Sequence, residues 1–119
     1  MVKRNPESLL PLTPAMFHVM VALADGQTHG YAILKEVEQL TGGGVRLSTG
    51  TLYGIIKRLL QEGLIAEMRH RPAEGDDPRR RYYKLTDTGR QVAVAEAQRM
   101  EKLLARARSK RLIKAFKPA

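Results

Sequence analysis

The polar residues of the segment 49–62 are spaced so that they could contact nucleic acid. Thr49, Tyr53 and Lys57 stand four residues apart, which in a helix places them on one side. Hydroxyl, phenol and ammonium groups form hydrogen bonds with base edges and phosphates. Gly50 and Gly54 stand beside them and would let a partner surface approach the backbone closely. An ordinary solvated helix face would show the same pattern, so a second signal is needed.

A cluster of cations further along the chain supplies that signal. Six positive side chains crowd two short stretches that flank a polar turn, and they are Arg69, Arg71, Arg79, Arg80, Arg81 and Lys84. Their mutual repulsion costs stability unless an anion lies near, and a DNA backbone is such an anion. A basic edge strand that deters strand pairing is the alternative. Three consecutive arginines exceed what that task needs.

The overall charge agrees with a nucleic-acid partner. The chain has 21 Lys and Arg against 12 Asp and Glu, which gives a formal net charge of +9 over 119 residues. RNA-binding and membrane-surface proteins share such a balance, so charge alone does not choose among them. The length fits one domain.

Several chemistries have no support in the residues. The chain has no cysteine, which excludes disulfides and thiolate-ligated metals. His18, His29 and His70 are scattered without metal-ligand spacing, and no nucleophile stands beside a base, so we expect neither a metal or other cofactor nor catalysis. No segment approaches the ~20 apolar residues of a membrane span. We expect a soluble cytoplasmic protein with no membrane partner.

Helix signals divide the first half of the chain into three segments. Thr13-Pro14 is a typical helix start, and the apolar run 15–24 that follows ends at Asp25-Gly26. A second helix is expected from Gly30 to Leu40, with an apolar side made of Tyr31, Ile33, Leu34, Val37 and Leu40. Ser48 is expected to cap a third helix over 49–62, with an apolar side made of Leu52, Ile55, Ile56, Leu59 and Leu60.

The segments 64–71 and 79–85 alternate like strands around a turn-rich stretch, which predicts a hairpin. A long helix over 87–111, capped by Thr86, is expected to follow it and to reach ~35 Å. One narrow stripe along this helix is spaced like a coiled-coil contact, and it consists of Ala93, Ala97, Met100, Leu103, Leu104 and Ala107. The stripe could fold back onto its own domain or meet the same helix of a second subunit. The second arrangement is favoured because the stripe is narrow and the helix overruns the domain.

The predicted fold class is therefore mainly α with a small β-hairpin (α+β). It is a winged helix-turn-helix followed by a long C-terminal dimerisation helix. We expect an irregular N-terminal arm over 1–12, a DNA-binding domain over 13–86, the dimerisation helix over 87–111 and a basic tail over 112–119.

Four short motifs carry a family resemblance when they are taken in order. They are Thr28-His29-Gly30-Tyr31-Ala32-Ile33, Leu47-Ser48-Thr49-Gly50-Thr51-Leu52-Tyr53, Leu59-Leu60-Gln61-Glu62-Gly63-Leu64-Ile65 and the run from Arg79 to Arg90. The combination resembles the PadR family of bacterial transcription regulators over roughly residues 12–100. Thr49 stands where that family often has proline, so the contact at this helix start differs in detail. The single C-terminal helix resembles the short subfamily.

The resemblance implies a homodimer that binds a double-stranded, inverted-repeat operator, usually as a repressor released by a small molecule or a cellular signal. It also implies that Tyr31, which spacing alone places in the core, touches a phosphate. The implied recognition surface consists of Ser48, Thr49, Thr51, Tyr53 and Lys57, and the implied backbone contacts are Arg79, Arg80, Arg81 and Lys84.

Two other functions remain open at this point. A small RNA-binding or ribosome-associated protein shares the charge but does not explain the long helix. A winged-helix module that binds an acidic protein would use the same surfaces. Competition between duplex DNA and structured RNA separates the RNA-binding alternative from a DNA-binding function. The absence of any nucleic-acid binding would favour the module that binds an acidic protein.

Overall fold

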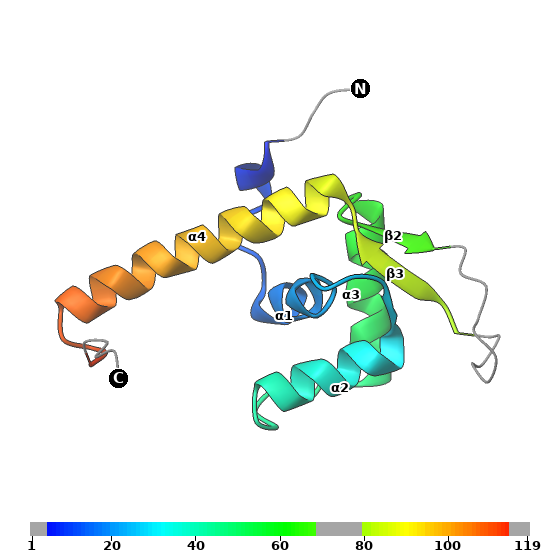
Figure 1. Cartoon of the computed structure of the whole chain (residues 1–119), viewed down its shortest axis with the longest axis horizontal. Helices are drawn as coiled ribbons and strands as arrows, with labels where there is room; N and C mark the ends of the chain where they lie inside the picture. Colours follow the sequence, from blue (N-terminus) through cyan, green and yellow to red (C-terminus); the bar gives the residue numbers. More distant parts are fainter. Residues whose placement is uncertain (1–4, 69–79, 115–119) are drawn as a thin grey trace.

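A computed structural model describes residues 5–68 and 80–114. Within them a short 3-10 helix, four α-helices and three strands follow one another, and the second half of α4 projects away from the rest (Figure 1). Their bounds are η1 Pro6–Leu9, α1 Pro14–Ala22, β1 Thr28–His29, α2 Gly30–Leu40, α3 Thr49–Gln61, β2 Ile65–Met68, β3 Tyr82–Leu85 and α4 Asp87–Ser109. The predicted order of three helices, a hairpin and a long helix is confirmed.

Three of the α-helices, α1, α3 and α4, begin where hydroxyl side chains can cap them. The side-chain oxygens of Thr13, Ser48 and Thr86 each accept a hydrogen bond from the backbone N–H three residues later, at 3.2, 3.0 and 3.0 Å. Such a cap satisfies one of the first N–H groups, which have no partner inside the helix. All three caps were predicted from the sequence because capping depends on neighbours along the chain.

The strands form one antiparallel sheet in the order β1-β3-β2. Strand β2 pairs with β3 from Ile65 opposite Leu85 to Met68 opposite Tyr82, as expected for the hairpin. Strand β1 was not predicted. It consists of two residues that pair with the far edge of β3, where Thr28 lies opposite Tyr83. This pairing joins the start of α2 directly to the sheet.

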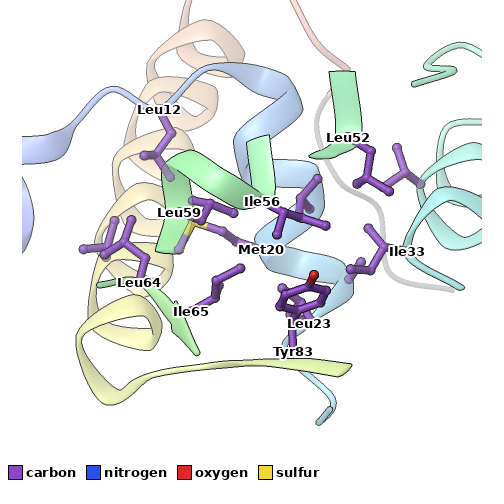
Figure 2. Packing of buried hydrophobic residues seen from close by; sticks show 14 residues of the cluster. Leu12, Met20, Leu23, Ile33, Leu52, Ile56, Leu59, Leu64, Ile65 and Tyr83 are labelled. Carbon is purple, nitrogen blue, oxygen red and sulfur yellow. The ribbon is translucent and has the colours of Figure 1, made fainter. Parts of the chain in front are cut away.

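The core lies where α1, α2, α3, the sheet and the start of α4 meet (Figure 2). Met20, Ile33, Leu52, Ile56, Leu59 and Leu64 are among its fully buried side chains. Each such side chain contributes about 1.5–3 kcal/mol by leaving water. The interpretation of α2 was wrong at its two ends, because Tyr31 is 57% and Leu40 63% exposed.

The junction between the sheet and α4 fixes the direction in which α4 leaves the domain. The Thr86 backbone N–H donates to the Leu64 carbonyl oxygen at 3.1 Å, and the Thr86 hydroxyl donates to the Gly63 carbonyl oxygen at 2.7 Å. A Cβ atom on Gly89 would lie 1.8 Å from the Leu64 carbonyl oxygen, far inside van der Waals contact. Only glycine fits this position without a shift of the backbone.

The N-terminal arm is more ordered than the sequence predicts. Its described part includes η1, which packs against α4, and ends at the buried Leu12. The Leu12 N–H donates to a carboxylate oxygen of Glu96 at 2.7 Å, and Glu96 is fully buried in α4. The hydrogen bond from Arg99 lowers the pKa of this carboxyl, and the Leu12 N–H lowers it further, while burial opposes both. The expectation of an irregular arm was wrong because the bond that orders it joins residues 84 positions apart.

The two halves of α4 have different surroundings. Val92 and Glu96 are buried, and Ala93 packs against the core of its own domain. Ala93 belongs to the predicted stripe of six residues, which we now call the α4 seam. Of its other members, Ala97 is exposed, Met100 and Ala107 are partly exposed, and Leu103 and Leu104 are 60% and 49% exposed. The first half of α4 therefore folds back onto its own domain, while the apolar stripe of the second half is uncovered within the described chain.

Candidate nucleic-acid interface

The outward side of α3 is polar and accessible over its whole length. Leu52, Ile56 and Leu59 hold its opposite side in the core. The predicted recognition residues of α3 and its cap all lie at the surface: Ser48, Thr49, Thr51, Tyr53 and Lys57. With about 100° of rotation per residue, Gly50, Gly54 and Lys57 lie farthest from the core.

Ser48 and Thr51 form a pair at the start of α3. The Ser48 hydroxyl accepts from the Thr51 N–H at 3.0 Å and donates to the Thr51 hydroxyl oxygen at 2.9 Å. These bonds fix the positions of both side-chain oxygens. Ser48 therefore acts first as a helix cap.

A pocket opens beside α3, where the start of α2 meets the start of β3, and we call it the α2–β3 pocket. Its volume is about 420 Å³. Seven described residues line it, namely His29, Gly30, Tyr31, Tyr53, Arg80, Arg81 and Tyr83. Four of the predicted DNA contacts thus come together here from three different elements: Tyr31, Tyr53, Arg80 and Arg81.

Tyr53 of α3 and Gly30 of α2 lie close together at this pocket. A Cβ atom on Gly30 would lie 2.9 Å from the Tyr53 hydroxyl oxygen and 3.3 Å from the ring carbon that bears it. The Tyr53 phenol therefore lies against the first residue of α2. Any larger residue at position 30 would push that phenol away.

His29 connects the start of α2 with β3. Its Nδ1 accepts from the Ala32 N–H at 3.2 Å and thereby caps α2. Its Nε2 lies 3.4 Å from the Arg80 guanidinium, and its ring contacts the edge of Tyr82 with ring centres 5.4 Å apart. The imidazole and the Arg80 guanidinium thus lie side by side in the lining of the α2–β3 pocket.

The remaining groups around the pocket are cations and phenols. Lys35 lies over the Tyr31 ring, with its ammonium nitrogen 5.4 Å from the ring centre, which is a cation–π contact. Arg81 approaches Glu67 at 3.7 Å, and both side chains are largely exposed. Burial, assisted by the Glu67 charge, raises the pKa of the Tyr83 phenol, so its hydroxyl stays protonated and can donate.

Other predicted residues lie apart from this pocket. Lys57 is exposed further along α3, and Lys84 is exposed on β3, and neither lines the pocket. Arg79 lies outside the described residues, as do Arg69 and Arg71. Sequence reasoning assigned His29 only to the start of α2 and did not single out Gly30 as a site residue. The His-Gly-Tyr motif was the available signal, but its partner Arg80 stands 51 residues away.

The sequence from residue 19 to residue 95 matches the model of a family described as "Transcriptional regulator PadR-like family". The chain belongs to this family. The match covers α2, α3, the sheet and the first half of α4, and so includes every element of the α2–β3 pocket. The resemblance inferred from the four motifs is therefore confirmed.

Two relatives and one solved structure illustrate the similarity. The chain is 33% identical over 86 residues to a transcriptional regulator of Mycobacterium tuberculosis, covering 72% of this chain and 75% of that protein. It is 41% identical over 92 residues to an uncharacterised transposon protein of Streptomyces fradiae, and this match covers 77% of the chain but only 24% of the relative. The fold is similar to that of Bacillus subtilis PadR, solved in complex with operator DNA, with a TM-score of 0.59, 22% identity and coverage of 71% and 47% of the two chains.

Two other kinds of feature are absent from the part of the chain that the structure describes. No helix there combines the length and apolar character needed to cross a bilayer. No three His, Asp or Glu side chains there are grouped so that they could hold a metal ion.

Proposed function

We propose that this regulator binds a double-stranded operator with α3 in the major groove and the α2–β3 pocket beside the sugar–phosphate backbone. One observation carries the proposal: Tyr53 belongs both to the exposed side of α3 and to the lining of a pocket that contains two arginines. Side chains that can bind base edges and side chains that can bind phosphates therefore lie next to each other on one surface. Bacillus subtilis PadR, a protein of similar fold, was solved in complex with operator DNA, which supports operator DNA as the partner.

The dimensions of α3 suit this task. Its 13 residues span about 20 Å, and the B-DNA major groove is about 12 Å wide and admits one helix. Thr49, Thr51 and Lys57 would face the base edges. Arg80, Arg81 and Lys84 would face phosphates, as would Arg79, which lies outside the described residues. The net charge of +9 favours association with any duplex.

Binding measurements on two duplexes test this division of roles. Operator fragments are first selected from genomic DNA, and affinity is then measured on the operator and on random duplex over a range of salt. Arg81→Ala should weaken binding to both duplexes alike and reduce the salt slope by about one. Lys57→Ala should cost more on the operator than on random duplex. Equal losses for both variants on both duplexes would refute the division, and tighter binding to structured RNA would refute a duplex DNA target.

We also propose that the protein acts as a homodimer through the second half of α4. The α4 seam exposes Leu103 and Leu104, and a second copy of the same helix would cover them. A two-fold axis between the subunits would place two α3 helices about one turn of DNA apart. The operator would then be an inverted repeat with half-site centres about 10 base pairs apart.

We further propose that the protein represses transcription and that a small molecule releases it from the operator. A cavity of about 380 Å³ lies between the N-terminal arm and α3, with Leu9, Met16 and Ile55 among its lining residues. This volume is within the range of small-molecule sites. Because Thr51 and Gly54 also line the cavity, a compound bound there would contact α3 next to the surface proposed to face DNA. A reporter gene placed behind the operator should be silenced by the protein. Activation of the reporter would contradict repression.

A further inference from the structure

The α2–β3 pocket is lined by groups that donate hydrogen bonds. His29, Tyr31, Tyr53, Arg80, Arg81 and Tyr83 all carry N–H or O–H groups. None of the described residues that line it is acidic, although Glu67 approaches Arg81 at 3.7 Å from β2. The donors come from β1 and the start of α2, from α3, and from β3 with the two residues that precede it. A pocket with this lining favours an anion that has several acceptor oxygens.

We infer that the α2–β3 pocket clamps a single phosphodiester group of the DNA backbone, and that Tyr53 is one of its phosphate ligands and not a base reader. The inference rests on the DNA-binding function proposed above and adds a specific role for Tyr53. Arginine matches phosphate oxygens with paired N–H groups, and tyrosine hydroxyls are common phosphate donors. A clamp that joins α2, α3 and β3 to one phosphate would fix the register of α3 along the groove.

The position of the Tyr53 phenol supports this role. Its hydroxyl oxygen lies 2.9 Å from the Cβ position of Gly30, so the side chain is directed from α3 toward the start of α2. A base reader would point away from the core, along the direction of Lys57. Tyr31 lines the same pocket from α2, and its ring is held by Lys35. Two phenols and the two arginines thus surround the space that a phosphate would occupy.

His29 and Arg80 give an independent reason to expect an anion here. Because Nδ1 accepts from the Ala32 N–H, the neutral imidazole carries its hydrogen on Nε2. That Nε2 lies 3.4 Å from the Arg80 guanidinium, so two N–H groups converge at the pocket. An oxygen placed beside both groups could accept a hydrogen bond from each of them. A phosphate supplies such oxygens.

The test combines protein variants with duplexes in which one phosphate at a time is replaced by an uncharged methylphosphonate. On the selected operator, one replacement per half-site should cost the unaltered protein about tenfold in affinity, or about 1.4 kcal/mol. In Tyr53→Phe and in Arg80→Ala the same replacement should cost clearly less than tenfold, since one of the groups that bind the phosphate oxygens is already missing. Tyr82→Phe is the matched control, because it removes a phenol that does not line the pocket, and it should keep the full tenfold sensitivity.

The possible outcomes separate this inference from the proposed function. Failure to bind any duplex would overturn both. Duplex binding in which Tyr53→Phe keeps full sensitivity at every phosphate, or loses discrimination between operator and random duplex, would overturn the clamp and leave the DNA-binding proposal in place. The alternative ligand is free phosphate. It is tested by a titration with inorganic phosphate that follows the backbone amide signals of Gly30 and Tyr31. Shifts there without any methylphosphonate effect would overturn the assignment to the DNA backbone.

Discussion

Gly54→Ala is expected to move protein stability and DNA affinity in opposite directions. A Cβ atom built on Gly54 has no atom within 4 Å, and its φ angle is not in the left-handed region. Neither packing nor backbone conformation therefore requires glycine at this position. Because alanine favours the interior of a helix over glycine by about 0.8–1.0 kcal/mol, the variant should be more stable by roughly that amount.

The same methyl group should weaken operator binding. Gly54 lies on the side of α3 farthest from the buried Leu52, Ile56 and Leu59, where the proposed complex brings the helix axis close to the base pairs. A methyl group there would hold α3 away from the groove and lengthen several contacts together. Because one good base contact is worth about 1–3 kcal/mol, we expect a loss of ~1.4 kcal/mol, or about tenfold in affinity.

Thermal unfolding and operator titration on the same preparation provide the assay. Gly63→Ala is the matched control for stability, because Gly63 has a φ of +73° and alanine is strained there. It should lower the stability where Gly54→Ala raises it. Unchanged operator affinity in Gly54→Ala would refute the close approach of α3, and a loss of stability would refute the open surroundings of its Cβ atom.

Three further predictions concern the arm, the junction and the seam. The lowered pKa of Glu96 predicts that Glu96→Gln lowers the free energy of unfolding by about 2 kcal/mol at pH 7. This loss should persist above the unfolded pKa near 4.3 and should vanish as the pH falls through the folded pKa. Acid unfolding measures it, with the exposed Glu101→Gln as the control. An identical acid profile for Glu96→Gln and the parent would contradict the buried ion pair. Gly89→Ala should cost about 1–3 kcal/mol or more in urea unfolding, because its methyl group would meet the Leu64 carbonyl, and full stability would contradict this junction. Leu104→Glu should give monomers in sedimentation, with weak operator binding, and an undisturbed dimer would exclude the α4 seam as the interface.

The parts of the fold that depend on near neighbours could be predicted from the sequence. Ser48 begins α3 because its hydroxyl reaches an N–H three residues away, and Gly63 follows the end of that helix within two residues. The hairpin of β2 and β3 was likewise predicted from alternating residues and the turn-rich stretch between them. These signals need no knowledge of the tertiary structure.

The parts that were missed depend on contacts between distant residues. Strand β1 has only two residues and exists through its pairing with β3. The ordered arm depends on Glu96, a charged residue that periodicity arguments assign to the surface but that is buried because Leu12 and Arg99 satisfy its oxygens. The α2–β3 pocket likewise joins Tyr31 with Arg80, so its existence becomes visible only when α2 and β3 are brought together.

The central claim is that the outward side of α3 faces the base pairs of an operator. The absence of cysteine allows this claim to be tested with a single Gln61→Cys variant that carries an iron–EDTA group on the exposed end of α3. Cleavage of the operator duplex should occur in two clusters, with centres about 10 base pairs apart, one for each subunit. The same label at Leu40→Cys, which is exposed at the far end of α2, should cut weakly. Strong cleavage from position 40 with none from position 61 would contradict the account.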